Sequence, residues 1–256
     1  NDVVEMVAFD VFSVGDTVSA KDGGSFAGNV AMAGTLGVTG NVGVGVTPST
    51  LLHIKGANPV YRIEDNNETG SGNIVFRDSA RETAKISVAS GASASMQFQT
   101  LGTEAMRIDA TGAVTMPLQP AFLAHPSSTQ SNIAVGSDIT VLFATEIFDQ
   151  NADFNTANYT FTAPVTGRYQ FNIVYYLENI DTATGYYYIF FDTSNRNYFN
   201  IISPAFTADT SYLSLTLSML VDMDASDTAL CKIRQSHGTS QTDISGNSFF
   251  SGYLVA

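Results

Sequence analysis

The fold of this chain is decided by the stretch FATEIFDQNADFNTANYTFTAPVTGRYQF, residues 143–171. Aromatic residues recur along it, separated by clusters of Asp, Asn, Thr and Gly, and Tyr169 and Phe171 lie two positions apart. Residues two positions apart in a strand point to the same face, so these two rings can fill a core. Gly167 suits a turn that needs permissive backbone angles. The stretch therefore predicts short strands joined by polar turns.

The same pattern continues to the end of the chain. Strands are predicted over residues 169–176, 186–191, 212–220 and 249–255, with Ser, Thr, Asn, Asp and Gly clusters between them. Regular short strands without helical periodicity are typical of a β-sandwich or jelly roll. The second part of the chain, from residue 119 on, is expected to be such a domain.

Seven positions within this stretch have the spacing F-x5-[ND]-x4-aromatic-x6-F-x5-G-x-Y-x-F; they are Phe143, Asp149, Phe154, Phe161, Gly167, Tyr169 and Phe171. The pattern resembles the signature of the globular head of complement component 1, subcomponent q, a relative of the tumour-necrosis-factor jelly roll. Residues 120–122 and 250–254 resemble the first and last strands of that family. One position departs, because Ile173 stands where the signature has Phe or Tyr. The resemblance implies a ten-stranded jelly roll that assembles as a homotrimer, with the seven signature residues in structural roles.

The composition changes near Leu118, where 15 of the 21 glycines precede and 22 of the 28 aromatic residues follow. Two domains are therefore expected, a shaft over residues 1–118 and a head over residues 119–256. Between residues 30 and 46 every second position is apolar or glycine, the alternation of short strands in a repetitive sheet. Such a strip has too few large side chains to close a core, so we expect it to pair with copies of itself around an axis.

Two segments carry a second resemblance. GNVGVGVTPSTLLHIKG (residues 40–56) and EAMRIDATGAVTM (residues 104–116) are similar to segments of bacteriophage tail fibres, in which they form interwoven triple-stranded β shafts. The resemblance covers residues 28–116. It implies three chains, as does the resemblance of the head, so the predicted fold class is all-β with a trimeric shaft and a jelly-roll head.

Charge and motifs exclude several function classes. With 11 basic and 24 acidic residues the net charge is −13, the wrong sign for binding nucleic acid or anionic lipid, and no run of ~18 apolar residues would insert into a membrane. His53, His125 and His237 are too scattered for a transition-metal site, and no nucleophile elbow or phosphate-binding loop is present. Cys231 lies on an alternating apolar run and is expected to be a buried thiol. We therefore expect no enzyme and no cofactor.

An acidic cluster leaves one ion open. Asp222, Asp224 and Asp227 have oxygen ligands that suit calcium, but their spacing is not that of an EF-hand, and a turn-forming role for Asp227 explains it better. Some members of the complement family bind calcium near the trimer apex. The resemblance therefore leaves calcium binding as an alternative but does not locate a site for it.

The resemblance to the complement family implies that the two termini of the head lie close together, near the shaft. Alternating connections in an antiparallel jelly roll then place loops 178–185, 203–210 and 237–246 at the end away from the shaft, and loops 193–197 and 222–227 at the shaft side. Loops carried on a rigid sandwich commonly bind ligands, and hydroxyl and amide groups suit a sugar or a protein. The candidate receptor-binding residues are Glu178, Asn179, Asp181, Thr182, Thr207, Asp209, His237, Thr239, Gln241 and Asp243. Solvated turns are the alternative for each of them.

The aromatic run YYYIFF, residues 186–191, is interpreted as a strand buried on one face by the sandwich and on the other by a neighbouring chain, in preference to a sugar-stacking platform.

These observations predict a homotrimeric phage tail fibre, a receptor-binding protein that mediates host attachment by binding a glycan or protein of the bacterial surface. Its partners would be two identical chains and other structural proteins of the virion, in a tail or capsid fibre. The alternative is a structural virion fibre or decoration protein whose head caps and trimerises the shaft. A glycan-cleaving fibre and a secreted adhesin are further alternatives, and residues 1–27 have no assigned role.

Overall fold

The computed structural model describes residues 35, 38–44, 46–63, 70–91 and 94–256, and every element it defines there is a β-strand. The chain forms two compact units, Asn1–Arg62 and Ile63–Ala256. The all-β class predicted from the sequence is confirmed. The domain boundary predicted at 118/119 falls between the last strand of one sheet and the first strand of the head. No helix in the described part of the chain is long and apolar enough to cross a membrane.

In the first unit, β1 (Val42–Val44) pairs in parallel with β2 (Leu52–Ile54). Both strands lie within residues 40–56, the first of the two segments similar to phage fibres. Much of the alternating strip, at residues 30–34, 36–37 and 45, lies outside the described residues, as does the segment 1–27.

The second unit begins with a five-stranded antiparallel sheet in the order β3 (Ser71–Arg77), β4 (Glu82–Ala89), β5 (Ser95–Thr100), β6 (Thr103–Ile108) and β7 (Val114–Thr115). Polar turns join neighbouring strands: Asp78 accepts from the backbone N–H of Arg81, and Asp109 accepts from that of Ala113. Residues 104–116, the second segment with the fibre resemblance, thus contain two strands that pair with each other within one chain.

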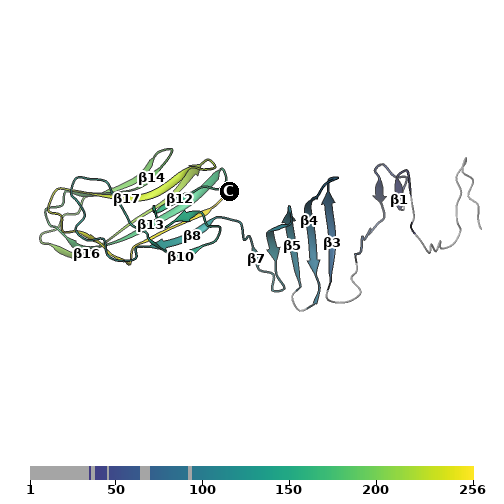
Figure 1. Cartoon of the computed structure of the whole chain (residues 1–256), viewed down its shortest axis with the longest axis horizontal. Coiled ribbons are helices and arrows are strands. Elements are labelled where there is room, and N and C mark those ends of the chain that lie inside the picture. The colour runs from purple at the N-terminus through teal and green to yellow at the C-terminus, as the bar shows by residue number, and fades with distance from the viewer. Residues whose placement is uncertain (1–34, 36–37, 45, 64–69, 92–93) are drawn as a thin grey trace, which may run out of the picture. The chain divides into compact units, whose positions relative to one another are not determined.

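The head is a sandwich of two antiparallel sheets (Figure 1). One sheet has the order β10 (Thr145–Asp149), β8 (Ala121–His125), β19 (Phe249–Leu254), β13 (Gly167–Ile180) and β16 (Thr210–Met223), with β18 (Asp243–Ile244) also on β13. The other has the order β11 (Phe154–Asn155), β12 (Thr160–Thr162), β17 (Thr228–Ser236), β14 (Tyr186–Thr193) and β15 (Asn197–Ile202), with β9 (Ile139–Thr140) on β17. Five strands follow each path, which gives the ten of the predicted jelly roll plus two short additions.

The core of the head is aromatic, and the signature residues build it. Phe122 stacks on Phe154 and Phe161 at centroid distances of 4.8 and 5.2 Å, and Phe250 meets it edge-on at 4.8 Å. The signature rings at 143, 161, 169 and 171 are all fully buried. Ile173, where the sequence departs from the signature, is 1% exposed, so an aliphatic side chain fills that core position.

Two signature residues act through the backbone. The carboxylate of Asp149 accepts from the N–H of Phe154 at 2.8 Å and so fixes the turn that leads into β11. Gly167 does not have the left-handed backbone angles expected for it, because it begins the long strand β13. Its requirement is space: a Cβ there would lie 2.7 Å from the carbonyl oxygen of Ala256 and 2.7 Å from Leu254.

The aromatic run on β14 alternates as expected, with Tyr187 and Phe191 in the core. On the outer face Phe190 is only 1% exposed within a single chain, with Tyr188 4.7 Å away between ring centroids. A neighbouring chain is therefore not needed to bury Phe190, which corrects that part of the interpretation. Cys231 is buried as predicted, and burial raises the pKa of its thiol well above the ordinary value.

Candidate functional site

The structure brings three of the predicted loops together at one end of the head, with Asp209 at the centre. One carboxylate oxygen of Asp209 accepts from the backbone N–H of Thr182 at 2.9 Å, and the other from the side-chain amide of Gln241 at 3.2 Å. The hydroxyl of Thr182 donates to the carbonyl of Phe206 at 3.1 Å. The loops that follow β13, β15 and β17 are therefore tied to one another through a single aspartate.

Asp181 holds two of these loops from below the surface. It is 6% exposed, and its carboxylate accepts from the backbone N–H of Ala183 at 2.7 Å and from the hydroxyl of Thr239 at 2.7 Å, as well as from the Thr239 N–H. The N–H of Ala183 is the largest cause that lowers the pKa of Asp181, followed by the bonds from Thr239. Of the ten candidate residues, Asp181 is thus one that positions the loops and does not present its carboxylate to a ligand.

A fourth segment, which sequence reasoning missed, joins the same end. Asp243 accepts from Asn179 at 2.8 Å with one oxygen and from the backbone N–H of Asn132 at 2.7 Å with the other. Ser240 donates to the carbonyl of Ile133 at 2.8 Å. Asn132 has φ of 55°, a conformation that asparagine tolerates better than most residues. The polar run at residues 127–132 was the only sequence signal for this segment.

The surface of this end is polar, and most of the candidate side chains are accessible. The six exposed ones are Asn179, Thr182, Thr207, Asp209, His237 and Thr239. Glu178, Gln241 and Asp243 are half-buried. Beneath them Gln235 is fully buried and donates to the carbonyls of His237 and Thr239, both at 3.0 Å, so the loop after β17 is anchored to its own strand.

The other end of the head is where the chain enters and leaves it. Leu254 donates its N–H to the carbonyl of Pro120, and Arg168 donates to that of Ala256. The 14 residues of β13 span about 43 Å from this end to the loop that begins at Asp181. The loops gathered around Asp209, here called the tip, are therefore at the end opposite to the chain entry, as the topology argument predicted.

The acidic cluster lies at the entry end and its oxygens have protein donors. The carboxylate of Asp222 accepts hydrogen bonds from Arg196 at 3.0 Å and from the hydroxyl of Tyr198. The bond from Tyr198 is the largest cause that lowers the pKa of Asp222. Asp227 accepts from the N–H of Asp224 at 2.7 Å across the turn between β16 and β17, so it has the predicted turn-forming role. In the described residues no group of three His, Cys, Asp or Glu side chains is arranged to hold a metal.

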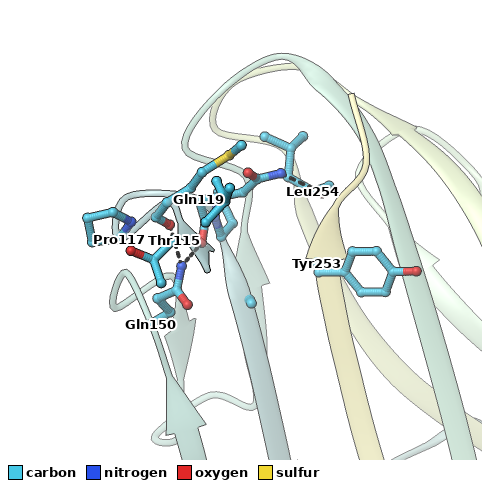
Figure 2. Close-up of a pocket in the computed structure, with 10 residues that line it drawn as sticks. Thr115, Pro117, Gln119, Gln150, Tyr253 and Leu254 are labelled. Atoms are coloured by element: carbon cyan, nitrogen blue, oxygen red, sulfur yellow. Dashed lines mark hydrogen bonds between the residues drawn. The ribbon is translucent and has the colours of Figure 1, made fainter. Parts of the chain in front are cut away.

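A cavity of about 550 Å³ lies at the junction that connects β7 to β8 (Figure 2). Gln150 donates to the carbonyls of Met116 and Gln119 at 2.8 and 2.7 Å, and Gln119 donates to that of Leu254 at 3.0 Å. These bonds fix the connector to the head. No carboxylate, histidine, lysine or thiol is among the residues that line the cavity, and Tyr253 contributes a phenol.

The two sheets, their strand order and the aromatic core define the head as a jelly-roll sandwich. The family model of the C1q domain matches residues 121–255, and the chain belongs to this family.

Solved structures similar to the chain include three that differ in origin. The globular domain of zebrafish complement 1qA is 17% identical, with a TM-score of 0.42, over 54% of this chain and 98% of that one. Murine APRIL is 15% identical, with a TM-score of 0.39, over 54% and 99% of the two chains. The PRD1 vertex protein P5 is 11% identical, with a TM-score of 0.38, over 54% and 96%. No curated protein sequence matches the chain.

Proposed function

We propose that this chain forms a homotrimeric fibre of a bacteriophage, in its tail or capsid, whose tip binds a receptor on the bacterial surface. The observation that carries the proposal is the convergence of three loops around Asp209, at the end of the head opposite to the chain entry. A fibre presents its free end to the cell, and this end bears most of the candidate residues on its surface. Residues 1–118 form the shaft, which other virion proteins hold.

The chemistry of the tip favours a neutral or cationic receptor. Loops 178–185, 203–210 and 237–246 contain Glu178, Asp181, Asp209 and Asp243 but neither Lys nor Arg. A phosphate-rich polysaccharide would be repelled, whereas neutral sugars and protein loops can exchange hydrogen bonds with hydroxyl and amide groups. Attachment relies on three tips per fibre, because linked weak contacts gain strength through effective concentration.

The test is binding of the fluorescently labelled full chain to a panel of bacterial strains, with two arginine variants. Thr207→Arg places a bulky charge on an exposed tip loop, and Ala225→Arg places the same charge on an exposed turn at the entry end. We expect the unmodified chain and Ala225→Arg to bind one strain equally, and Thr207→Arg to bind it about tenfold more weakly. Equal loss in both variants, or binding to no strain, contradicts the receptor role.

One observation favours a second function, that of a structural cap. Many tip side chains bond to one another, as in the pairs Asn179–Asp243, Asp209–Gln241 and Asp181–Thr239. Because these side chains have hydrogen-bond partners within the tip, they can close the end of a fibre without a ligand. In this case the head trimerises the shaft of a virion fibre or decoration protein, and the purified trimer does not compete with virions for adsorption to cells.

A further inference from the structure

The sheet formed by β3 to β7 has one face that is apolar from edge to edge. The register aligns Ile74, Ile86, Phe98 and Met106 in one row across four strands. A second row aligns Val88, Met96, Ile108 and Val114. Because Val88 lies two residues after Ile86 on the same strand, both rows are on the same face. These eight residues are called the apolar face below.

The described residues supply no second layer over this face. Four of the eight side chains are exposed, Ile74 at 44%, Val88 at 46%, Met96 at 40% and Val114 at 54%, and the other four are half-buried. Ile63 covers one corner, where its Cγ2 lies 3.3 Å from the position of a Cβ on Gly72. In the head, by contrast, aromatic side chains from two sheets bury one another completely. A contiguous apolar surface of this kind marks an interaction site.

The opposite face of the sheet carries the charged side chains, and a bulge in β6 helps to keep them away from the apolar face. Gln99 pairs with Glu104 and Phe98 with Met106, so Ala105 is an extra residue in β6. In a regular strand, residues three apart point to opposite faces, but the bulge turns Glu104 and Arg107 to the same side. They form an ion pair there, with Nε of Arg107 3.0 Å from a carboxylate oxygen of Glu104.

Charge also distinguishes this segment from the rest of the chain. Residues 71–115 contain four basic and four acidic side chains and have no net charge, whereas residues 119–256 contain 4 basic and 12 acidic ones and carry −8. Because the sheet has no net charge, its copies can approach one another without the long-range repulsion that a large net charge produces. A partner for the apolar face must be apolar, uncharged and equally wide, and the same face of another copy meets all three requirements.

We propose that the apolar face packs against the same face of two further copies of this chain, so that three sheets form a three-sided prism. The rows containing Ile86 and Val88 fill its interior, and the face with Lys85, Gln97 and Arg107 points to solvent. The number of copies rests on the proposed homotrimeric function, but the surface itself is argued from this sheet alone.

The test places a cysteine on either face of the same strand in the full chain, where the native Cys231 is buried. Phe98→Cys lies on the apolar face and Gln97→Cys on the opposite one, and both positions are half-buried in the single chain. A disulfide requires Cβ atoms within about 4.5 Å. Under mild oxidation we expect Phe98→Cys to give covalent pairs of chains on a denaturing gel, and Gln97→Cys to stay single.

A second matched pair, Ile86→Cys and Lys85→Cys on β4, repeats the test in case loss of the Phe98 ring disturbs the sheet. Light scattering of each variant gives its mass before oxidation. A trimeric mass with no cross-link, or with equal cross-linking from both faces, overturns the proposed packing and leaves trimerisation to the head. A monomeric mass overturns both the proposed packing and trimerisation by the head. Cross-linking from the apolar face only, without binding to any cell, supports the prism while it removes the receptor function.

Discussion

Gly252 shows at the scale of one residue why the head tolerates so little change in its core. This glycine is buried on β19, and a Cβ there would lie 2.3 Å from a ring carbon of Phe171 and 2.8 Å from one of Phe122. Both rings belong to the stacked aromatic core and cannot move without displacing others. The residue is required because two rings occupy the volume of its missing side chain.

We therefore expect Gly252→Ala to lower the free energy of unfolding by roughly 1–3 kcal/mol, the usual cost of overpacking a core. The neighbouring Ser251→Ala points to the other face of β19 and should change it by less than about 0.5 kcal/mol. Urea unfolding followed by near-ultraviolet circular dichroism of the buried tyrosines measures both. Equal stability of the two variants would show that the rings can move aside.

Asp181 gives the tip a dependence on pH. Its pKa is lowered in the folded chain by bonds from Ala183 and Thr239, so its stabilising effect is present above the ordinary value of 3.8 and is lost as the pH falls through the lowered value. We expect the amides of Ala183 and Thr239 to lose protection from hydrogen exchange only in that acidic range.

The variant Asp181→Asn should weaken the same two amides at neutral pH, because the neutral side chain accepts hydrogen bonds less strongly than a carboxylate. Asp192→Asn on β14 is the control, since it removes one carboxylate without contacting these loops. Unchanged protection of both amides in Asp181→Asn would mean that other contacts hold the tip.

At the scale of an element, the turn between β5 and β6 is strained by its sequence. Leu101 and Gly102 form a two-residue connection with φ of 50° and 79°, the left-handed conformation of the turns that match strand twist. Glycine adopts this conformation freely, whereas leucine does so at a cost, and the Leu101 side chain is 60% exposed and packs little in return.

Leu101→Asn is expected to stabilise this hairpin by about 1 kcal/mol, since asparagine is favoured at the first position of such turns. Gly102→Ala should destabilise it by a similar amount. Hydrogen exchange of the β5 and β6 amides in the full chain reads out both changes. Opposite signs are the expected result, and stabilisation by Gly102→Ala would contradict the assigned backbone conformation.

The strands of the head were predicted from alternation, but their lengths were not. The strand expected over residues 169–176 extends over Gly167–Ile180, and the one expected over residues 212–220 extends over Thr210–Met223. The two pair with each other along almost their whole length. Alternation locates a strand where apolar residues are frequent, whereas pairing with a partner far away in sequence extends it through polar residues such as Glu178 and Asp222.

At the scale of the whole molecule, the proposed fibre and the proposed prism of sheets both depend on the association of three copies of the chain. Three chains of 27.2 kDa give about 82 kDa, and we expect this mass from light scattering of the full chain. The Thr207→Arg variant should also have the mass of a trimer, because the substituted loop lies at the tip, away from the connector and the β3–β7 sheet. A monomer at micromolar concentration would contradict the shared assumption of three copies.

The sequence by itself determined the all-β class, the break in composition near Leu118 and the family of the head, because alternation and the spacing of aromatic residues are local properties. It also predicted which loops share an end, since connections in an antiparallel sandwich alternate. Only the tertiary structure decided which side chains of the tip form hydrogen bonds with one another, and that the backbone of Asn132 takes part in this network.

The structure likewise decided that Gly167 is needed for space, and that a bulge at Ala105 leaves one face of the β3–β7 sheet free of charge. The physical reason is the same in each case. These features depend on register and on contacts between residues far apart in the chain, and a single insertion in one strand changes the face of every residue that follows it.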